Sequence, residues 1–255
     1  MTAYAPDQRP PLRRVLAGSS MRTPSAPLGV AVVTDLVGAI VTGELQPGDV
    51  LPPESSLSQQ FGVSRTVIRE SVKRVEEKGL LTVAQGRGTT VNPATAWNVL
   101  DPVVLSALVD HDDSLGVLDE LTVVRASLEA SMASAAASRQ TPELSAALEE
   151  AYQRSVATFD DFETYIDADA EFHYTVMEQS GNLLAANITH ILFARARESS
   201  RFTGAVTQEA LVLTLAEHKA ILDAIVAGNA EQAAATMHDH ICGAWSRRRQ
   251  SVSRS

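Results

Sequence analysis

The sequence predicts a mainly α-helical protein, with an N-terminal winged helix-turn-helix that carries a small β-wing and a C-terminal, all-α antiparallel helical bundle. Residues 51–88 contain two helical patterns around a tight turn at Gly62-Val63, and a hairpin tip at Gly86-Arg87-Gly88 follows them. Beyond residue 101 no convincing strand pattern occurs. Aromatic residues make up only 5% of the chain, while Ala, Leu and Val abound, and this composition favours helices.

The first part of the chain is predicted to hold a tail and the winged domain. Residues 1–27 combine five prolines with Ser, Thr and Arg and lack an apolar period, which indicates a disordered tail. The winged helix-turn-helix is expected at 28–93. Ser64 is a suitable N-cap for its third helix, and Gly79 ends that helix. Helices are predicted at 28–42, 55–61 and 64–78, and wing strands at 80–83 and 89–91.

The remainder is predicted to be a linker at 94–101 and a helical domain at 102–250. Gly, Asn, Asp and Pro interrupt the helical pattern at six places. Seven helices separated by these breaks would pack as an antiparallel bundle of six or seven members. They are predicted at 101–110, 114–139, 141–159, 161–180, 182–203, 206–227 and 230–248.

Charge and cysteine content limit the classes of function. The formal net charge of −10 is unevenly distributed: residues 1–97 carry 10 Lys and Arg against 8 Asp and Glu, and the rest of the chain carries 11 against 23. Phosphate binding requires local positive charge, so the N-terminal part is the candidate for nucleic-acid contact. A single cysteine, Cys242, excludes an intrachain disulfide and fits a cytoplasmic protein. We expect no membrane span, because no apolar run approaches ~18 residues. We also expect no secretory signal, because the first thirty residues lack a hydrophobic core flanked by a cleavage site.

The start of the third helix combines the side chains that DNA recognition requires. Arg65, one residue after the N-cap, can make a bidentate contact with guanine in the major groove. Backbone phosphates can be gripped by hydroxyl groups and cations, which are supplied by Ser64, Thr66, Arg69, Lys73 and Arg87. The alternative is a small helical module whose scattered arginines bind another protein. The wing and the Ser-Arg-Thr start favour DNA.

One stretch resembles the winged helix of the GntR superfamily of bacterial repressors: GELQPGDVLPPESSLSQQFGVSRTVIRESVKRVEEKGLLTVAQGRGTTV. The resemblance covers about residues 30–92 and rests on the LP-x-E-x-x-L step, on G-V-S-R-T-x-x-R-E and on the G-L-L start of the wing. Many members carry Arg directly after the Glu of the first step, where this chain has Ser55, so one phosphate or base contact is expected to be lost or weakened. The resemblance implies DNA contacts by Ser64, Arg65, Thr66, Arg69 and Gly86.

The acidic helical part contains an Asp-His pair and two further histidines suited to metal binding. Asp169 and His173 are four residues apart and would project from one face of a helix. His218 and His240 are expected on two other helices, and the four side chains would make a nitrogen-rich site for a divalent ion. Spacing alone leaves open that these are surface or core histidines, because Asp-x-x-x-His occurs by chance.

Two stretches resemble the FCD-type, FadR-like effector domain of the same superfamily: DAEFHYTVMEQSGN and EHKAILDAIVAGNAEQAAATMHDHI. That resemblance implies a divalent metal, most readily Zn²⁺ and otherwise Ni²⁺ or Mn²⁺, bound by Asp169, His173, His218 and His240. His190 has no counterpart in the pattern, and His238 lies two residues from His240 and would point away from it on a helix, so both are interpreted as surface residues.

A third stretch, VVRASLEASMASAAA, is similar to the first long helix of that domain, in which an arginine faces the ligand cavity. The similarity makes Arg125 the implied contact of a carboxylate effector, and the alternative is a surface ion pair with Glu129 or Glu120. The junction from Trp97 to Pro102 is similar to that of sugar-acid-responsive members. No pattern selects among Arg195, Arg197 and Arg201 as a further contact.

These features predict a ligand-responsive transcriptional regulator, and specifically a repressor, rather than an enzyme. The helical domain is expected to form a homodimer, so that two recognition helices bind double-stranded DNA at a near-palindromic operator. A small carboxylate or sugar-acid effector would weaken operator binding. Two alternatives stay open: a metal-dependent hydrolase or lyase that uses the Asp/His site, and a regulator whose metal is only structural.

Overall fold

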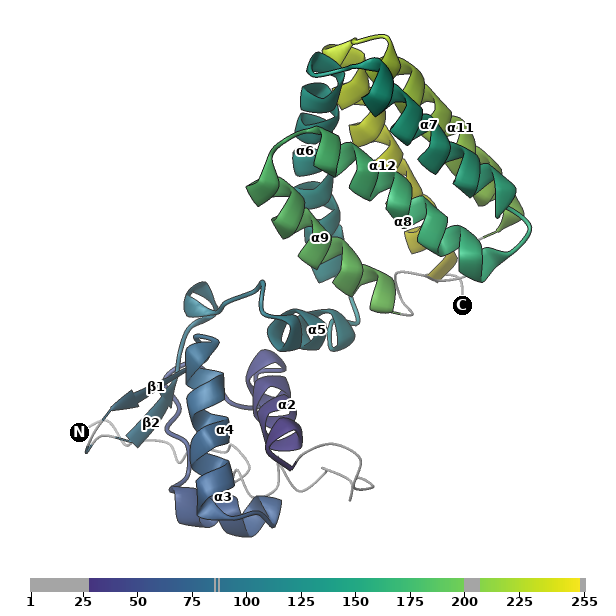
Figure 1. Ribbon diagram of the computed structural model, residues 1–255. Helices are drawn as coiled ribbons and strands as arrows, with labels where there is room; N and C mark the ends of the chain where they lie inside the picture. Colours follow the sequence, from purple (N-terminus) through teal and green to yellow (C-terminus); the bar gives the residue numbers. More distant parts are fainter. Residues whose placement is uncertain (1–27, 85, 87, 200–206, 253–255) are drawn as a thin grey trace, which may run out of the picture. The chain divides into compact units, whose positions relative to one another are not determined.

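The computed structural model describes residues 28–84, 86, 88–199 and 207–252, and the chain forms two compact units that divide between His111 and Asp112. Both units are mainly helical, and the one sheet among the described residues is a two-stranded antiparallel wing in the first unit (Figure 1). The predicted fold class is thereby confirmed. The predicted disordered tail at 1–27 lies outside the described residues. No helix in the described part of the chain is long and apolar enough to cross a membrane.

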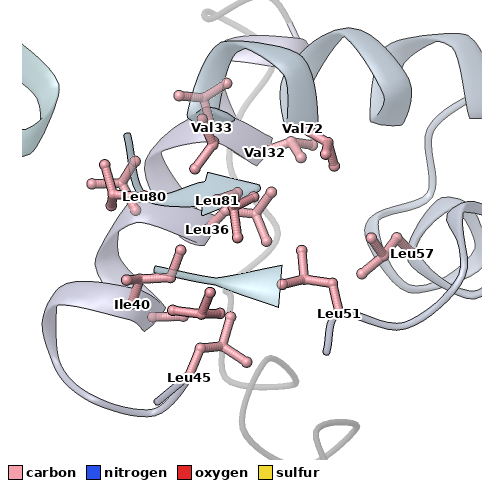
Figure 2. Close-up of a cluster of buried hydrophobic side chains, with 14 of the residues drawn as sticks. Val32, Val33, Leu36, Ile40, Leu45, Leu51, Leu57, Val72, Leu80 and Leu81 are labelled. Carbon is pink, nitrogen blue, oxygen red and sulfur yellow. The ribbon is translucent and has the colours of Figure 1, made fainter. Parts of the chain in front are cut away.

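The first unit contains the predicted helix-turn-helix. Helix α2 (Leu28–Val41) precedes α3 (Glu54–Phe61) and α4 (Arg65–Glu77). Gly62 ends α3 with a φ of +66°, a left-handed conformation that glycine adopts without steric cost. Apolar side chains from these helices and from the wing share one core, because each element buries a single apolar face. Figure 2 shows the members of this core that point into the same interior, among them Leu36, Ile40, Leu51, Leu57, Val72, Leu80 and Leu81.

The wing consists of β1 (Leu81–Ala84) and β2 (Gly88–Val91), paired antiparallel. A third extended segment at 48–51 continues this sheet beyond β2: the Leu51 N–H donates to the Thr89 carbonyl at 2.8 Å. No strand was predicted here, because a short segment bordered by prolines shows no alternating pattern. The additional pairing ties the wing to the chain immediately before α3.

The predicted linker at 94–101 is ordered and packs on the first unit. After the short 3₁₀ helix η2 (Ala94–Ala96), Trp97 packs against the apolar core. Helix α5 (Pro102–Asp110) also contributes buried apolar side chains to that core and packs against α2. The predicted boundary at residue 102 therefore moves to residue 112, because the apolar face of α5 is covered within the first unit.

The second unit is a helical bundle, and its described helices match the predicted segments to within a few residues. The last helix returns along the first, and the neighbouring helices pack on that pair (Figure 1). Many alanines line the core and allow the helices to approach closely. The predicted continuation of one helix to residue 203 falls partly outside the described residues. The helices are α6 (Gly116–Ser138), α7 (Pro142–Ala157), α8 (Phe162–Gln179), α9 (Leu183–Glu198), α11 (Gln208–Val226) and α12 (Ala230–Val252).

Candidate functional site

Helix α4 has one buried face and one exposed face. Ile68, Val72 and Val75 are buried in the core of the first unit. The hydroxyl of Ser64 accepts a hydrogen bond from the Val67 N–H at 3.3 Å, so Ser64 is the N-cap that the sequence predicted. The predicted DNA contacts of this helix and its cap are all exposed, namely Ser64, Arg65, Thr66, Arg69 and Lys73.

The wing places one further predicted contact on the surface. Gly86 is exposed at the hairpin tip with a φ of +78°, a conformation that favours glycine. Arg87, the other predicted contact of the wing, lies outside the described residues. A groove of about 570 Å³ separates the wing from α4, and its walls include the charged side chains of Glu54, Arg69 and Lys73.

Helices α8, α11 and α12 bring three histidines to one point inside the second unit. The Nε2 atoms of His173 and His218 each lie 3.2 Å from the Nε2 atom of His240, and all three side chains are buried. Asp169 lies one helical turn before His173, and its Oδ1 is 3.7 Å from the Nε2 atom of His218. The three histidines of the predicted metal set therefore come together, and Asp169 lies beside one of them, His218.

The geometry of this cluster fits a divalent cation. Two nitrogens bound to one ion at about 2.1 Å lie about 3.0–3.4 Å apart when the bond angle is roughly 90–110°. The two observed separations of 3.2 Å fall in this range. Imidazole nitrogens whose lone pairs face each other repel unless positive charge lies between them. The three histidines could therefore hold a metal ion, and their donor type suits zinc and related metals.

Two carboxylates orient two of the histidines by contacting their Nδ1 atoms. Glu129 Oε2 lies 2.7 Å from His173 Nδ1, and Glu217 Oε2 lies 2.8 Å from His240 Nδ1. Because an ionised carboxylate only accepts hydrogen bonds, each Nδ1 carries the proton and each Nε2 presents a lone pair to the cluster. Sequence reasoning missed both glutamates as site residues. Glu217 adjoins His218 in the chain, and that adjacency gives no sign that it contacts His240 instead.

The surroundings keep two of these histidines neutral. Burial lowers the pKa of His218 well below its ordinary value, and the neighbouring His240 and His173 lower it further. Burial also lowers the pKa of His240, although Glu217 opposes this effect. Neutral imidazole is the form that binds metal ions. Among the described residues none bonds to His218 Nδ1, and the His218 ring stacks on Phe172 with 4.3 Å between the ring centres.

Arg125 is buried beside the histidines. Its Nε donates to Glu129 Oε1 at 2.8 Å, and its guanidinium carbon lies 3.7 Å from the centre of the Phe193 ring. Burial opposes the ionisation of Glu129, but the charge of Arg125 and the hydrogen bonds from Arg125 and His173 outweigh it and lower the pKa of Glu129 to about 2. The ion pair that the sequence offered as a surface alternative for Arg125 is thus present, but it lies inside the domain.

A cavity of about 20 Å³ adjoins the histidine cluster and has room for about one water-sized group. Its wall combines cationic and neutral polar groups with a single carboxylate, so an anionic group would meet mainly favourable partners. The polar and charged residues of the wall include Thr122, Arg125, Asp169, His173, His240 and Arg248.

The described residues that the sequence left unassigned do not line this cavity. His190 and His238 are exposed, in agreement with their interpretation as surface residues. Arg195 forms an ion pair with Glu198 on its own helix, and Arg197 pairs with Asp167 at 2.7 Å. Arg201 lies outside the described residues.

Two family models match the chain. Residues 28–91 match the bacterial regulatory proteins of the gntR family, and residues 120–242 match the FCD domain. The galactonate operon transcriptional repressor of Escherichia coli strain K12 is 32% identical over 209 residues, which cover 81% of this chain and 91% of that protein. The HTH-type transcriptional regulator LutR of Bacillus subtilis strain 168 is 29% identical over 206 residues, which cover 79% of this chain and 92% of that protein.

A solved structure has the same fold at low sequence identity. The structure of Lar, which controls the expression of the Listeria monocytogenes agr system, superposes with a TM-score of 0.56. The match covers 89% of this chain and 99% of that chain at 20% identity. At that identity the likeness concerns the fold alone.

Proposed function

This chain belongs to the GntR family of bacterial regulatory proteins and is a transcriptional regulator with an FCD domain rather than an enzyme, and on that premise we propose that it is a ligand-responsive repressor. A homodimer in the cytoplasm binds a near-palindromic operator through two α4 helices. The helical domain binds a divalent metal and a small carboxylate or sugar acid, and this effector weakens operator binding. The proposal is carried by the convergence of Asp169, His173, His218 and His240 beside Arg125.

The exposed face of α4 supports the DNA-binding part of this proposal. Arg65 lies in the first turn of the helix, from which a guanidinium reaches guanine in the major groove. Thr66 and Lys73 are exposed and suit contacts with the phosphate backbone. The hydroxyl oxygen of Ser64 accepts the capping bond, and its O–H stays available as a donor to phosphate. Ser55, exposed at the start of α3, offers no cation, so the contact there is weak.

The donor set supports Zn²⁺ ahead of Ni²⁺ or Mn²⁺. Three imidazole nitrogens and one carboxylate oxygen match the ligands of a four-coordinate zinc ion, whereas Mn²⁺ prefers oxygen donors. Glu129 and Glu217 hold His173 and His240 in the tautomer that such binding needs. When bound, the ion supplies a positive charge that attracts an effector carboxylate.

The cavity supports an acidic effector. Arg125 and Arg248 both line it, and a guanidinium recognises a carboxylate through two parallel hydrogen bonds. A sugar acid is supported by the similarity to the galactonate operon repressor. A space of about 20 Å³ is too small for a whole sugar acid, so the effector requires a wider form of the cavity. A ligand that binds only one of two forms shifts the protein towards that form, and this shift is the proposed switch.

Operator binding and its release test the proposal. The zinc-loaded full-length chain is expected to retard a promoter duplex in a gel-shift assay, and titration with galactonate, gluconate or lactate is expected to weaken binding by about 5- to 150-fold for one of them. His218→Ala should abolish both zinc binding and this response. His238→Ala, which removes an exposed histidine of α12, should change neither. Failure to bind any duplex, or indifference to every acid, would refute the repressor proposal.

A purely structural metal is the second candidate, and the small cavity favours it. In that case zinc raises the melting temperature of the wild-type chain and of His238→Ala but not of His218→Ala, while no acid changes operator binding. The same variants therefore separate the two candidates. A melting temperature indifferent to zinc would contradict both.

A further inference from the structure

A two-point ion pair joins an exposed carboxylate to the recognition helix. Glu54 opens α3, and Arg69 lies in the second turn of α4. The Nε of Arg69 donates to Glu54 Oε1 at 3.0 Å, and its Nη2 donates to Glu54 Oε2 at 2.9 Å. This bidentate arrangement fixes both the position and the plane of the guanidinium group.

The pair contributes little to holding the fold together. The side chains of Arg69 and Glu54 are 71% and 40% exposed, and water and salt screen ion pairs in that setting. Buried apolar contacts through Leu57 and Ile68 already join α3 to α4. The role of the pair is therefore better sought on the outer, DNA-facing side of α4.

The pair lies on the exposed side of the recognition helix, next to the wing. Glu54, Arg69 and Lys73 line the groove between α4 and the wing. Two of the guanidinium N–H groups are used by Glu54, which leaves the others as donors. The hydrogen bond from Arg69 lowers the pKa of Glu54, and the nearby charge of Arg65 lowers it further, so Glu54 stays ionised at neutral pH.

We propose that Glu54 is a positioning residue that sets the DNA sequence specificity of the recognition helix by holding Arg69 in one orientation. The inference rests on the proposed DNA-binding function. A long side chain that is already ordered loses less conformational entropy on binding than a mobile one. A guanidinium with a fixed plane also matches the acceptor pair of one base better than those of others.

If Glu54 acted through its charge alone, removing that charge would strengthen DNA binding rather than reduce the preference for one sequence. A carboxylate close to DNA repels phosphates, so its neutralisation should strengthen binding to every sequence. Positioning predicts that the neutral variant loses its preference for the operator, even if its affinity for all DNA rises. The ratio of specific to non-specific affinity therefore distinguishes the two effects.

The test uses the full-length chain. The wild type first selects duplexes from a random-sequence library, and its Kd is then measured for the selected duplex and for a shuffled duplex at one salt concentration. Glu54→Gln is expected to lower the ratio of the two affinities about tenfold, which is within the range for one bidentate base contact. Glu77→Gln removes the same charge from an exposed position at the end of α4 and should leave the ratio unchanged.

A second substitution ties the effect to Arg69. Arg69→Lys keeps the charge but cannot form the planar, two-point pair, so Glu54→Gln should change the ratio no further in that background. The unfolding midpoint should be the same for the wild type and Glu54→Gln. An unchanged ratio in Glu54→Gln, or a full tenfold loss in the Arg69→Lys background, would overturn the inference. A wild-type chain that selects no sequence would overturn the proposed DNA-binding function, and the inference with it.

Discussion

The two units hold the same kind of ion pair in opposite surroundings. In the first unit the side chains of Arg69 and Glu54 are 71% and 40% exposed, whereas in the second unit those of Arg125 and Glu129 are 6% and 1% exposed. An exposed pair can meet a large polyanion such as DNA. A buried pair can meet only a molecule that is small enough to enter. Burial thus determines whether an Arg–Glu ion pair is accessible to a macromolecule or only to a small ligand.

The cores of the two units also differ in how many polar and charged side chains they bury. Among the described residues, Ser71 is the one buried polar side chain of the first unit, whereas the second unit buries three histidines together with Arg125 and Glu129. Removing an ion from water costs several kcal/mol unless its partners replace the lost hydration. The stability of the second unit should therefore depend on charge and metal, and that of the first on packing and backbone geometry. The two tryptophans report on this difference separately, because Trp97 lies in the first unit and Trp245 in the second.

Glu129→Ala should have the largest effect, because it leaves Arg125 and His173 buried without their shared partner. We expect the free energy of unfolding of the second unit to fall by about 3–5 kcal/mol. Urea unfolding of the metal-free chain, followed by Trp245 fluorescence in a Trp97→Phe background, measures this loss. Glu171→Ala is the control, because Glu171 is an exposed partner of Arg154 and its removal should cost less than about 1 kcal/mol. Equal losses in the two variants would contradict the buried role.

Zinc should stabilise the second unit alone. A ligand present at 100 times its Kd adds about 2.7 kcal/mol to the free energy of unfolding of the unit that binds it. The transition reported by Trp245 should therefore move to higher urea, while that reported by Trp97, in a Trp245→Phe background, should not. His240→Ala should remove the shift. A shift that survives this substitution would place the metal elsewhere.

Gly79→Ala should disturb the first unit alone. Gly79 has a φ of +80°, and an added β-carbon would lie 2.2 Å from the carbonyl oxygen of Ala96. The left-handed conformation by itself costs an alanine roughly 1–2 kcal/mol, and the steric clash adds to this, so we expect a loss of about 2 kcal/mol or more. The loss should appear in the Trp97 transition and not in that of Trp245. Gly43→Ala shares the positive φ but meets no neighbour, and should cost less.

Mild acid should again act on the second unit. Burial lowers the pKa of His218 and His240 in the folded chain, so the unfolded chain binds more protons and stability falls as the pH drops below about 6.5. At pH 5.5 the loss is at most about 1.4 kcal/mol per histidine in the metal-free chain. Glu129, with a pKa of about 2, still contributes fully at that pH. Equal changes in the Trp97 and Trp245 transitions between pH 7.5 and 5.5 would contradict this assignment.

Local patterns were sufficient for most of the secondary structure. Ser64 as an N-cap and Gly62 as a left-handed turn depend on the residues themselves, so both could be predicted. The domain to which α5 belongs could not, because an apolar helix joins whichever core covers it. The strand-like segment at 48–51 was also missed, since its hydrogen bonds are made to residues about forty positions away in the chain.

The sequence by itself determined the helices and the winged motif, because caps and helical periods depend on neighbouring residues. Spacing alone left the histidine cluster open, and the set of four residues followed from the resemblance to the FCD-type domain. Only the tertiary structure decided that Glu129 orients His173, that Glu217 orients His240 and that Glu54 holds Arg69. These contacts join residues 44, 23 and 15 positions apart. These contacts form only when whole helices pack against one another. That packing depends on all the residues of the core, so it cannot be predicted from neighbouring residues alone.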